Sequence, residues 1–168
     1  MTLDIKSLSR QYKIRLIQDT DVPLVYELCR RNLLYYQHCP PFVTEESIRR
    51  DMTALPPKKT AEDKYYVGFF DRQRLICVMD LIMDFPDNST AFIGFFMTDA
   101  SIQGKGVGSA IITDLCACLS EIGILSIRLG WVKGNLQAEH FWHKNGFTET
   151  GNTYGTDGYT VVVAQRAI

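Results

Sequence analysis

Apolar residues recur along the chain at two spacings, one typical of helices and the other typical of strands. Helical spacing is clearest in residues 107–122, where apolar side chains return every three or four positions and Gly123 marks the end. The same spacing, with capping residues and prolines near its ends, predicts further helices at 23–34, 44–55 and 136–144. Runs rich in apolar and aromatic residues predict strands at 14–17, 65–70, 75–83, 91–98 and 125–131, and residues 147–150 and 159–164 remain as a final strand pair.

The order of these elements changes past the middle of the chain. Three strands follow one another between residues 65 and 98 with short polar turns, which favours an antiparallel meander. After residue 98, helices alternate with strands. We therefore expect a mixed α/β (α+β) fold, with a central, largely antiparallel sheet of about seven strands flanked by about four helices. No repeat or linker divides the chain, so residues 1–168 are predicted to form a single domain.

Composition is that of an ordinary globular protein. Hydrophobic residues make up 46% and charged residues 22% of the sequence, and the formal net charge is -1. This balance offers no electrostatic footprint for a nucleic acid or an anionic membrane surface. No apolar run reaches the length of a membrane span, and the N-terminus lacks a signal-peptide core. The five cysteines are odd in number and lack zinc-finger spacing, so we expect a reducing cytoplasm and no bound metal.

A glycine-rich segment, Gln103–Gly108, lies between the predicted strand at 91–98 and the helix that follows. Its glycines leave backbone N–H groups unshielded, and the helix start adds the positive end of a helix dipole. Such a turn suits an anion like the pyrophosphate of a cofactor. The segment is not a P-loop, because Gly106 follows Lys105, nor a Rossmann fingerprint, because Ser109 replaces the third glycine. Taken alone, it also fits a simple helix entry without a ligand.

A second motif follows one predicted strand later. Residues 135–147 read Asn-x-x-Ala-x-x-Phe-Trp-x-x-Asn-Gly-Phe, and the earlier segment reads Gln-x-x-Gly-x-Gly in residues 103–108. In this order the two motifs resemble the GNAT superfamily of acetyl-CoA-dependent N-acetyltransferases. The resemblance covers about residues 90–150 by motif and nearly the whole chain by the order of elements. It implies a GNAT-like acyl-CoA N-acyltransferase fold, with acetyl-CoA as the acyl-donor substrate.

The resemblance also implies where acetyl-CoA binds. The glycine-rich segment would wrap the pyrophosphate with main-chain N–H groups, and Lys105 would either add charge beside a phosphate or be a solvated loop lysine. The preceding strand would offer its backbone to the pantetheine arm and splay from the next strand to admit the thioester. Asn135 would lie beside the pantetheine, with Phe141 and Trp142 near the sulfur. The implied cofactor-binding residues are Phe96, Met97, Thr98, Gln103, Gly104, Lys105, Gly106, Val107, Gly108, Ser109, Asn135, Phe141 and Trp142.

Acetyl transfer to an amine requires a base for the amine and stabilisation of the charge that develops on the thioester carbonyl. Asp80 is the leading candidate base, because it interrupts an apolar strand where burial would raise its pKa. A structural ion pair is the other interpretation of this carboxylate. Asp84 and Asp99 are weaker candidates near strand ends, and His38 is a candidate at the substrate mouth.

The residue expected to protonate the departing thiolate differs from the common family pattern. Many members place tyrosine where this chain has Trp142, and an indole donates a hydrogen bond but is not an acid at neutral pH. We therefore weigh a catalytic role for Trp142 against packing over the cofactor. His143, Tyr154, Tyr159 or solvent would be the substitutes.

The leading hypothesis is an N-acetyltransferase that moves acetyl from acetyl-CoA to a primary amine by direct attack in a ternary complex. The acceptor would be a small molecule or a peptide with an amine. The protein would be a monomer or a homodimer. A non-catalytic acyl-CoA-binding or sensing domain on the same fold is the alternative, and a nucleotide-binding protein is a third. The aromatic residues considered for the acceptor pocket are Tyr35, Tyr36, Phe42, Tyr65 and Tyr66.

Overall fold

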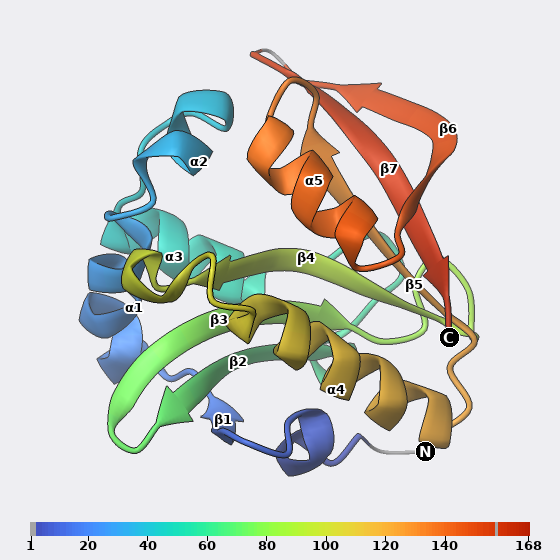
Figure 1. Ribbon diagram of the computed structural model, residues 1–168, viewed down its shortest axis with the longest axis horizontal. Coiled ribbons are helices and arrows are strands. Elements are labelled where there is room, and N and C mark those ends of the chain that lie inside the picture. Colours follow the sequence, from blue (N-terminus) through green and yellow to red (C-terminus); the bar gives the residue numbers. More distant parts are fainter. Residues whose placement is uncertain (1–2, 157) are drawn as a thin grey trace.

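The computed structural model describes residues 3–156 and 158–168, which contain one seven-stranded sheet (Figure 1). Its strands are β1 (Lys13–Leu16), β2 (Lys64–Asp71), β3 (Arg74–Ile82), β4 (Thr90–Thr98), β5 (Ser126–Val132), β6 (Thr148–Gly155) and β7 (Thr160–Ala167). Their order across the sheet is β1-β2-β3-β4-β5-β7-β6. Every neighbouring pair is antiparallel except β4 and β5, which are parallel. The mixed, largely antiparallel sheet expected from the sequence is therefore confirmed.

The described residues form five α-helices, where the sequence predicted about four. They are α1 (Val22–Cys29), α2 (Leu33–His38), α3 (Glu45–Thr53), α4 (Val107–Glu121) and α5 (Leu136–Lys144). The extra helix arises because the predicted helix at 23–34 breaks into α1 and α2 near Asn32. The side-chain amide of Asn32 donates a hydrogen bond to the Leu28 carbonyl at 3.1 Å and so caps the open end of α1. None of the helices in this part of the chain is both long and apolar enough to cross a membrane.

Helices cover both faces of the sheet. In Figure 1, α4 and α5 lie in front of the sheet, and their buried residues share one core cluster with the central strands. A second cluster packs α1 and α3 against the other face through residues such as Val25 and Ile48. Neighbouring residues of a strand point to opposite faces, so Phe95 packs with the second cluster and Phe96 with the first.

The last two strands are longer than the apolar pattern predicted. The prediction placed them at 147–150 and 159–164, whereas β6 continues to Gly155 and β7 to Ala167. β6 lies at the edge of the sheet with all of its residues exposed, so no apolar alternation marks it in the sequence.

β4 and β5 separate part way along their length. Their pairing ends at Ile93 and Leu129, although β4 continues to Thr98. At this point a bulge at Gly94 shifts the register between β4 and β3 beside Asp80. Beyond the bulge, the edge of β4 that faces β5 has no strand partner within the described residues. The split leaves backbone groups of β4 available in the middle of the sheet.

Candidate active site

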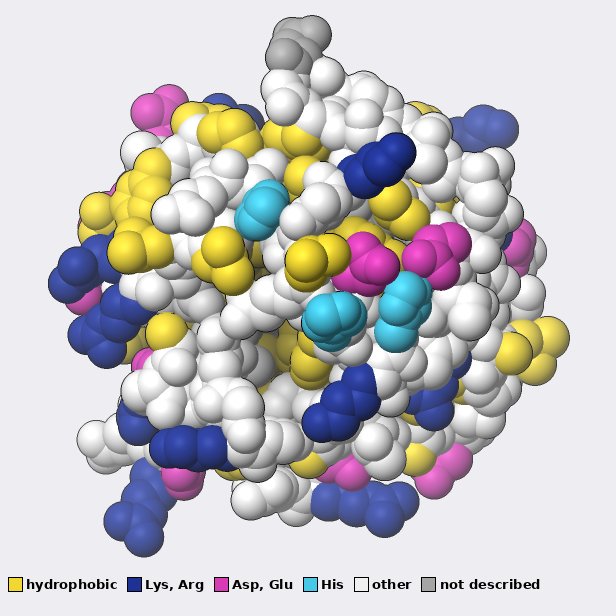
Figure 2. All heavy atoms as spheres, turned by 45° about the horizontal axis from the view of Figure 1, so that its top comes forward, with side chains coloured by type: hydrophobic (Ala, Val, Ile, Leu, Met, Phe, Trp, Pro, Cys, Tyr) yellow, Lys and Arg dark blue, Asp and Glu magenta, His cyan; other side chains and the backbone are white. Residues whose placement is uncertain are grey.

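The separation of β4 and β5 opens a cavity of about 590 Å³. Its walls come from β4, β5, the segment before α4, α5 and the tips of β6 and β7, with α2 beside one end. Figure 2 shows this side of the molecule, with a hollow near its middle that has hydrophobic side chains inside. Phe95 and Phe96 both line the cavity although they point to opposite faces of the sheet. The cavity is therefore a slot that reaches through the sheet.

We call the two parts of this slot the loop end and the tyrosine end. The loop end is lined by the glycine-rich segment, the start of α4 and α5. The tyrosine end is lined by Tyr35, Cys39, Phe95, Gly130, Tyr154, Tyr159 and Val161.

Free main-chain N–H groups distinguish the loop end. Gly104 and Gly106 have positive φ angles of 75° and 81°, and Gly106 is the last residue before α4. No protein oxygen in the described ranges accepts a hydrogen bond from the main-chain N–H groups of residues 104–109. The first such donor in α4 is Ala110, which bonds to the Gly106 carbonyl at 3.0 Å. Unpaired N–H groups at a helix start form a ready site for an anion.

Close packing and the Asn145 side chain hold α5 against the start of α4. A Cβ on Gly108 would lie 3.1 Å from the ring of Phe141, so glycine permits this close approach. The Asn145 side chain donates to the Ser109 hydroxyl at 3.1 Å. The buried Asn135 caps α5 by accepting a hydrogen bond from the first turn. The second sequence motif thus fixes α5 beside the loop end.

An aromatic cluster forms the wall between β4 and α5. The rings of Phe96 and Phe141 stack with centroids 5.8 Å apart. Trp142 lies 5.6 Å from Phe96 and 5.2 Å from Phe147, and it is only 7% exposed. Trp142 lines the cavity together with Phe96 and Phe141. Because it is buried among aromatic rings, its indole forms a firmly packed part of the wall.

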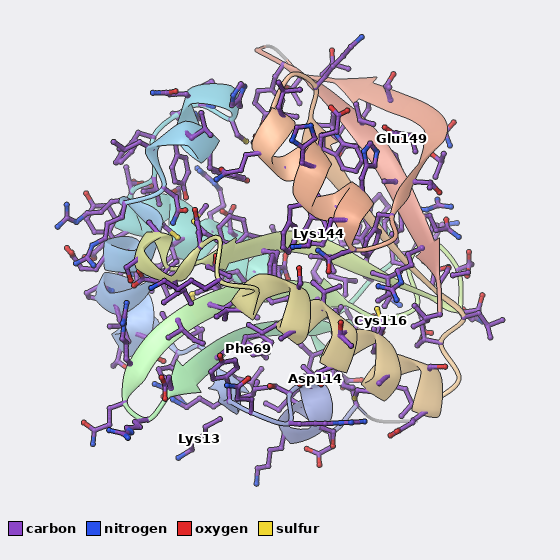
Figure 3. The ribbon with its side chains drawn as sticks, in the orientation of Figure 1. Lys13, Phe69, Asp114, Cys116, Lys144 and Glu149 are labelled. Carbon is purple, nitrogen blue, oxygen red and sulfur yellow. The ribbon has the colours of Figure 1, made fainter. Side chains whose placement is uncertain are left out.

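Lys144 is the single charged side chain among the described residues that line the cavity. It stands at the C-terminus of α5, near the start of α4 (Figure 3). Lys105, which the sequence placed beside a phosphate, is exposed and does not line the cavity. The cation beside free N–H groups strengthens the attraction of the loop end for an anion.

Asn32 joins the loop end to the helices on the other face of the sheet. Gln103 donates to the Asn32 side-chain oxygen at 2.6 Å and to the Thr98 carbonyl at 3.2 Å. The Asn32 amide also donates to the Thr98 carbonyl, at 3.2 Å. Both polar side chains line the cavity. Sequence reasoning did not select Asn32, whose only signal was a polar residue inside an apolar helix prediction.

Asp80 forms a buried ion pair on the face covered by α1 and α3. The Lys64 ammonium lies 2.7 Å and 2.8 Å from its two carboxylate oxygens, and the Lys64 and Asp80 side chains are 5% and 11% exposed. Burial raises the pKa of Asp80, an effect that Lys64 partly offsets. Asp80 does not line the cavity, but Gly94 does. The Oδ2 of Asp80 lies 2.7 Å from the position of a Cβ on Gly94, so the carboxylate packs directly against the glycine that lines the slot.

The tyrosine end is assembled from elements that are distant in the sequence. Cys39, at the end of α2, lies near the hydroxyl of Tyr159 just before β7. The Cys39 thiol, together with burial, raises the pKa of Tyr159 to about 12. The Tyr154 hydroxyl on β6 lies 3.7 Å from the position of a Cβ on Gly130 in β5. Helix α2 and the last hairpin therefore meet across the slot.

The other candidates for the base, Asp84, Asp99 and His38, do not lie in the slot. Burial raises the pKa of Asp99, but hydrogen bonds from Ser101 and Arg74 outweigh it and lower the value. Asp99 is therefore held as a structural cap before the loop. Asp84 is exposed, and neither Asp84 nor His38 lines the cavity.

Three residues were considered as substitutes for the missing tyrosine, and they lie in different places. Tyr154 and Tyr159 line the cavity. His143 does not, and its imidazole lies 2.9 Å from the carboxylate of Glu149 on β6. Figure 3 labels Glu149 on the side of α5 away from α4. Glu139 adds a third potential metal ligand to this exposed group, which lies apart from the slot.

The slot brings together most of the residues that the sequence selected. Every cofactor-binding residue implied by the resemblance lines it except Lys105. Of the five aromatic residues considered for the acceptor pocket, only Tyr35 lines it. Three further residues line the slot although the sequence did not single them out: Gly130, Lys144 and Val161. They belong to no motif and reach the slot only through the pairing of β5 with β7 and the position of α5.

Comparison with protein families agrees with this geometry. The profile of the Acetyltransferase (GNAT) family matches residues 25–147. No curated protein matches the sequence.

Solved structures share the fold at low identity. An acetyltransferase from Thermus thermophilus is 18% identical with a TM-score of 0.75, over 94% of this chain and 97% of that one. PaiA N-acetyltransferase from Thermoplasma acidophilum, in complex with coenzyme A, is 18% identical with a TM-score of 0.67, over 94% and 99%. A chimeric spermidine N-acetyltransferase from Vibrio cholerae and hSSAT is 19% identical with a TM-score of 0.68, over 94% and 95%.

Proposed function

Because the chain belongs to the acetyltransferase (GNAT) family, we propose that it transfers the acetyl group of acetyl-CoA to a primary amine by direct attack in a ternary complex. The single observation that carries this proposal is the slot at the split between β4 and β5, with unpaired N–H groups at its loop end. The acceptor is a small molecule or a peptide with a free amine.

Acetyl-CoA fits the slot as an extended substrate. Its pyrophosphate accepts hydrogen bonds from the N–H groups of residues 104–109, beside Lys144. Its pantetheine arm pairs with the free edge of β4 as an added strand, and Asn135 flanks it. The thioester then lies beside the aromatic wall formed by Phe141 and Trp142. The fold neighbour from Thermoplasma acidophilum, in complex with coenzyme A, supports this choice of substrate.

Direct transfer makes a C–N bond and breaks the C–S bond of the thioester. The neutral amine attacks the carbonyl carbon, and an N–H of β4 beyond the bulge stabilises the oxyanion. Asp80 is the proposed general base, which takes the amine proton through a water at Gly94. The thiolate leaves beside Trp142 and takes its proton from Tyr154, Tyr159 or solvent, since only these tyrosines line the slot among the substitutes considered.

Ligand binding and product formation test separate parts of this proposal. We expect coenzyme A, but not ATP or NAD, to raise the melting temperature of the protein. We also expect the mass of an amine in a mixed panel to increase by one acetyl group in the presence of acetyl-CoA. Stabilisation by ATP or NAD alone would reject the cofactor assignment. Stabilisation by coenzyme A without any acetylated amine would support the non-catalytic acyl-CoA-binding alternative.

We further propose that the protein acts in a reducing compartment such as the cytoplasm. All five cysteines are free thiols. Burial raises the pKa of Cys29 to about 11 and raises that of Cys77 as well, so these thiols are poorly reactive. Retention of all five free thiols in protein isolated under non-reducing conditions from its native compartment would support this assignment.

A further inference from the structure

The tyrosine end has a chemical character that the loop end lacks. We propose that it is an acceptor subsite for a primary amine carried on an uncharged, apolar or aromatic body. This inference rests on the acetyl transfer proposed above. The subsite is formed by Tyr35, Cys39, Phe95, Tyr154, Tyr159 and Val161.

These residues form a continuous wall at one side of the slot. The rings of Tyr35 and Phe95 meet edge to face, with centroids 5.8 Å apart. Cys39 lies near both this pair and Tyr159 of the hairpin, since it contributes to the raised pKa of Tyr35 and of Tyr159. Val161 continues the wall, since its Cγ1 lies 2.6 Å from the position of a Cβ on Gly130. The wall faces the part of the slot where β4 and β5 have separated, which is where the thioester is proposed to lie.

None of the described residues that form this wall carries a charge. No carboxylate lines the slot in the described ranges, and Lys144 belongs to the loop end. Asp80 is paired with Lys64 behind Gly94. Asp51, whose charge acts on Tyr35, does not line the slot either. A second ammonium group on the acceptor would lose water at this wall without gaining a counter-ion, which is unfavourable.

The wall offers aromatic surface and neutral hydroxyl groups instead. Aromatic faces bury the body of an amine and attract a single ammonium group before it loses its proton. Burial raises the pKa of Tyr35, and the pKa of Tyr159 is raised to about 12, so both phenols stay neutral near pH 7. The subsite therefore selects against polyamines, although a spermidine N-acetyltransferase shares the fold.

A matched pair of amines tests this selection. Hexylamine and hexamethylenediamine have the same carbon chain and differ by one distal ammonium group. We expect kcat/KM per amino group to be higher for hexylamine by about thirtyfold, because the diamine leaves a charge unpaired. Acetylated product is measured by mass spectrometry, and spermidine and a peptide with a free N-terminus complete the panel. Equal or better acetylation of the diamine or of spermidine would overturn the acceptor proposal and leave the proposed acetyl transfer intact.

A carboxylate introduced into the wall should reverse the selection. Tyr154 is 52% exposed, so Tyr154→Glu is expected to fold, and Tyr154→Gln is its uncharged control. We expect Tyr154→Glu, but not Tyr154→Gln, to shift the ratio of the two amines toward the diamine by about tenfold. Cys39→Asp with Cys39→Asn repeats the test from α2.

The variants and the amine panel separate the two proposals. Stabilisation by coenzyme A verifies that each variant retains its fold and its loop end. An unchanged amine ratio in both acidic variants, with that stabilisation retained, would mean that these residues do not contact the acceptor. Asp157 lies outside the described residues, so Asp157→Asn is assayed as well, and a hexylamine preference that rises in this variant would mean that a carboxylate already acts on the diamine, which would count against the subsite. A wild-type protein that binds coenzyme A and acetylates none of the amines would refute the proposed transfer itself, and the acceptor subsite with it.

Discussion

The two ends of the slot are built in contrasting ways. The loop end consists largely of consecutive residues. It presents main-chain N–H groups that are unpaired because the first turn of a helix has no preceding carbonyl groups to accept them. The tyrosine end is assembled from α2, β4, β5, β6 and β7, and it presents side chains. A backbone site binds a constant group such as a diphosphate whatever the neighbouring side chains are. A side-chain site changes with each substitution, so the two ends should respond differently to mutation.

The largest expected effect is at the loop end. Gly106→Val places a β-branched residue at a φ of 81° and directs its side chain into open space at the proposed pyrophosphate position. We expect affinity for coenzyme A to fall by at least about a hundredfold, equal to about 3 kcal/mol. Isothermal titration calorimetry measures this loss.

A second glycine of the same helix separates backbone strain from the loss of binding. Gly123 follows α4, has a φ of 90° and also faces open space. Gly123→Val should therefore have a comparable backbone strain of about 1–3 kcal/mol while leaving affinity for coenzyme A unchanged. Equal loss of affinity in both variants would indicate general destabilisation, and unchanged affinity in Gly106→Val would remove the loop from the binding site.

The next largest effect concerns the ion pair behind the slot. Asp80→Asn leaves the Lys64 ammonium buried without its partner, so we expect the free energy of unfolding to fall by about 3 kcal/mol. Lys64→Met should have a similar effect, and the double variant should recover most of the stability because neither charge remains. Urea unfolding of the three variants gives the coupling energy directly. Additive losses would mean that the pair does not act as a unit.

The same variant tests the catalytic role of Asp80. Burial raises the pKa of Asp80, and a base accepts a proton only above its pKa, so wild-type turnover should decline as the pH falls through that raised value. Turnover of Asp80→Asn should lack this decline. Its deficit relative to wild type should be largest between the raised pKa of Asp80 and the pKa of the amine, where the wild-type base is ionised and the free substrate still carries its proton. If the pH profile of kcat of Asp80→Asn keeps the wild-type shape, Asp80 is not the base and has only a structural role behind Gly94.

Sequence reasoning reached the loop end because its determinants are local. Residues 103–109 and 135–147 carry their own turn, cap and packing signals, such as the Asn135 cap and the Gly108 contact with Phe141. The sheet was also foreseeable, since each strand except β6 has an apolar pattern. These features depend on neighbours within a few residues or on repeated spacing.

The tyrosine end was not foreseeable, because its residues meet only through long-range pairing. Cys39 and Tyr159 come together after β7 inserts between β5 and β6, an order that no local pattern encodes. Asn32, at the break between α1 and α2, also bonds to Thr98, which is distant in sequence. The sequence indicates that a carboxylate in an apolar strand needs a partner. That this partner is Lys64 follows only from the register of β2 on β3.

A smaller effect is expected at the residue that connects the two ends. Asn32→Ala removes the acceptor for Gln103 and the donor to the Thr98 carbonyl. We expect affinity for coenzyme A to fall by about tenfold, because the loop loses a hydrogen-bonded support of about 1 kcal/mol. Asn152→Ala, in the exposed edge strand β6, is the matched control and should bind coenzyme A normally. Equal affinity in Asn32→Ala and wild type would show that the loop holds its shape without this connection.

The smallest effect is expected at Trp142, where the two ends share a wall. Its ring packs against Phe96 and Phe147, so Trp142→Phe keeps an aromatic surface while removing the indole N–H. If packing is its role, kcat at saturating amine should stay within about threefold of wild type, while stability falls by about 1 kcal/mol from the lost ring volume. Phe147→Leu, in the same cluster but absent from the cavity lining, controls for the packing loss. A fall in kcat of tenfold or more in Trp142→Phe alone would mean that the indole N–H hydrogen-bonds to the departing thiolate, and the proton source would then be sought around α5 instead of the last hairpin.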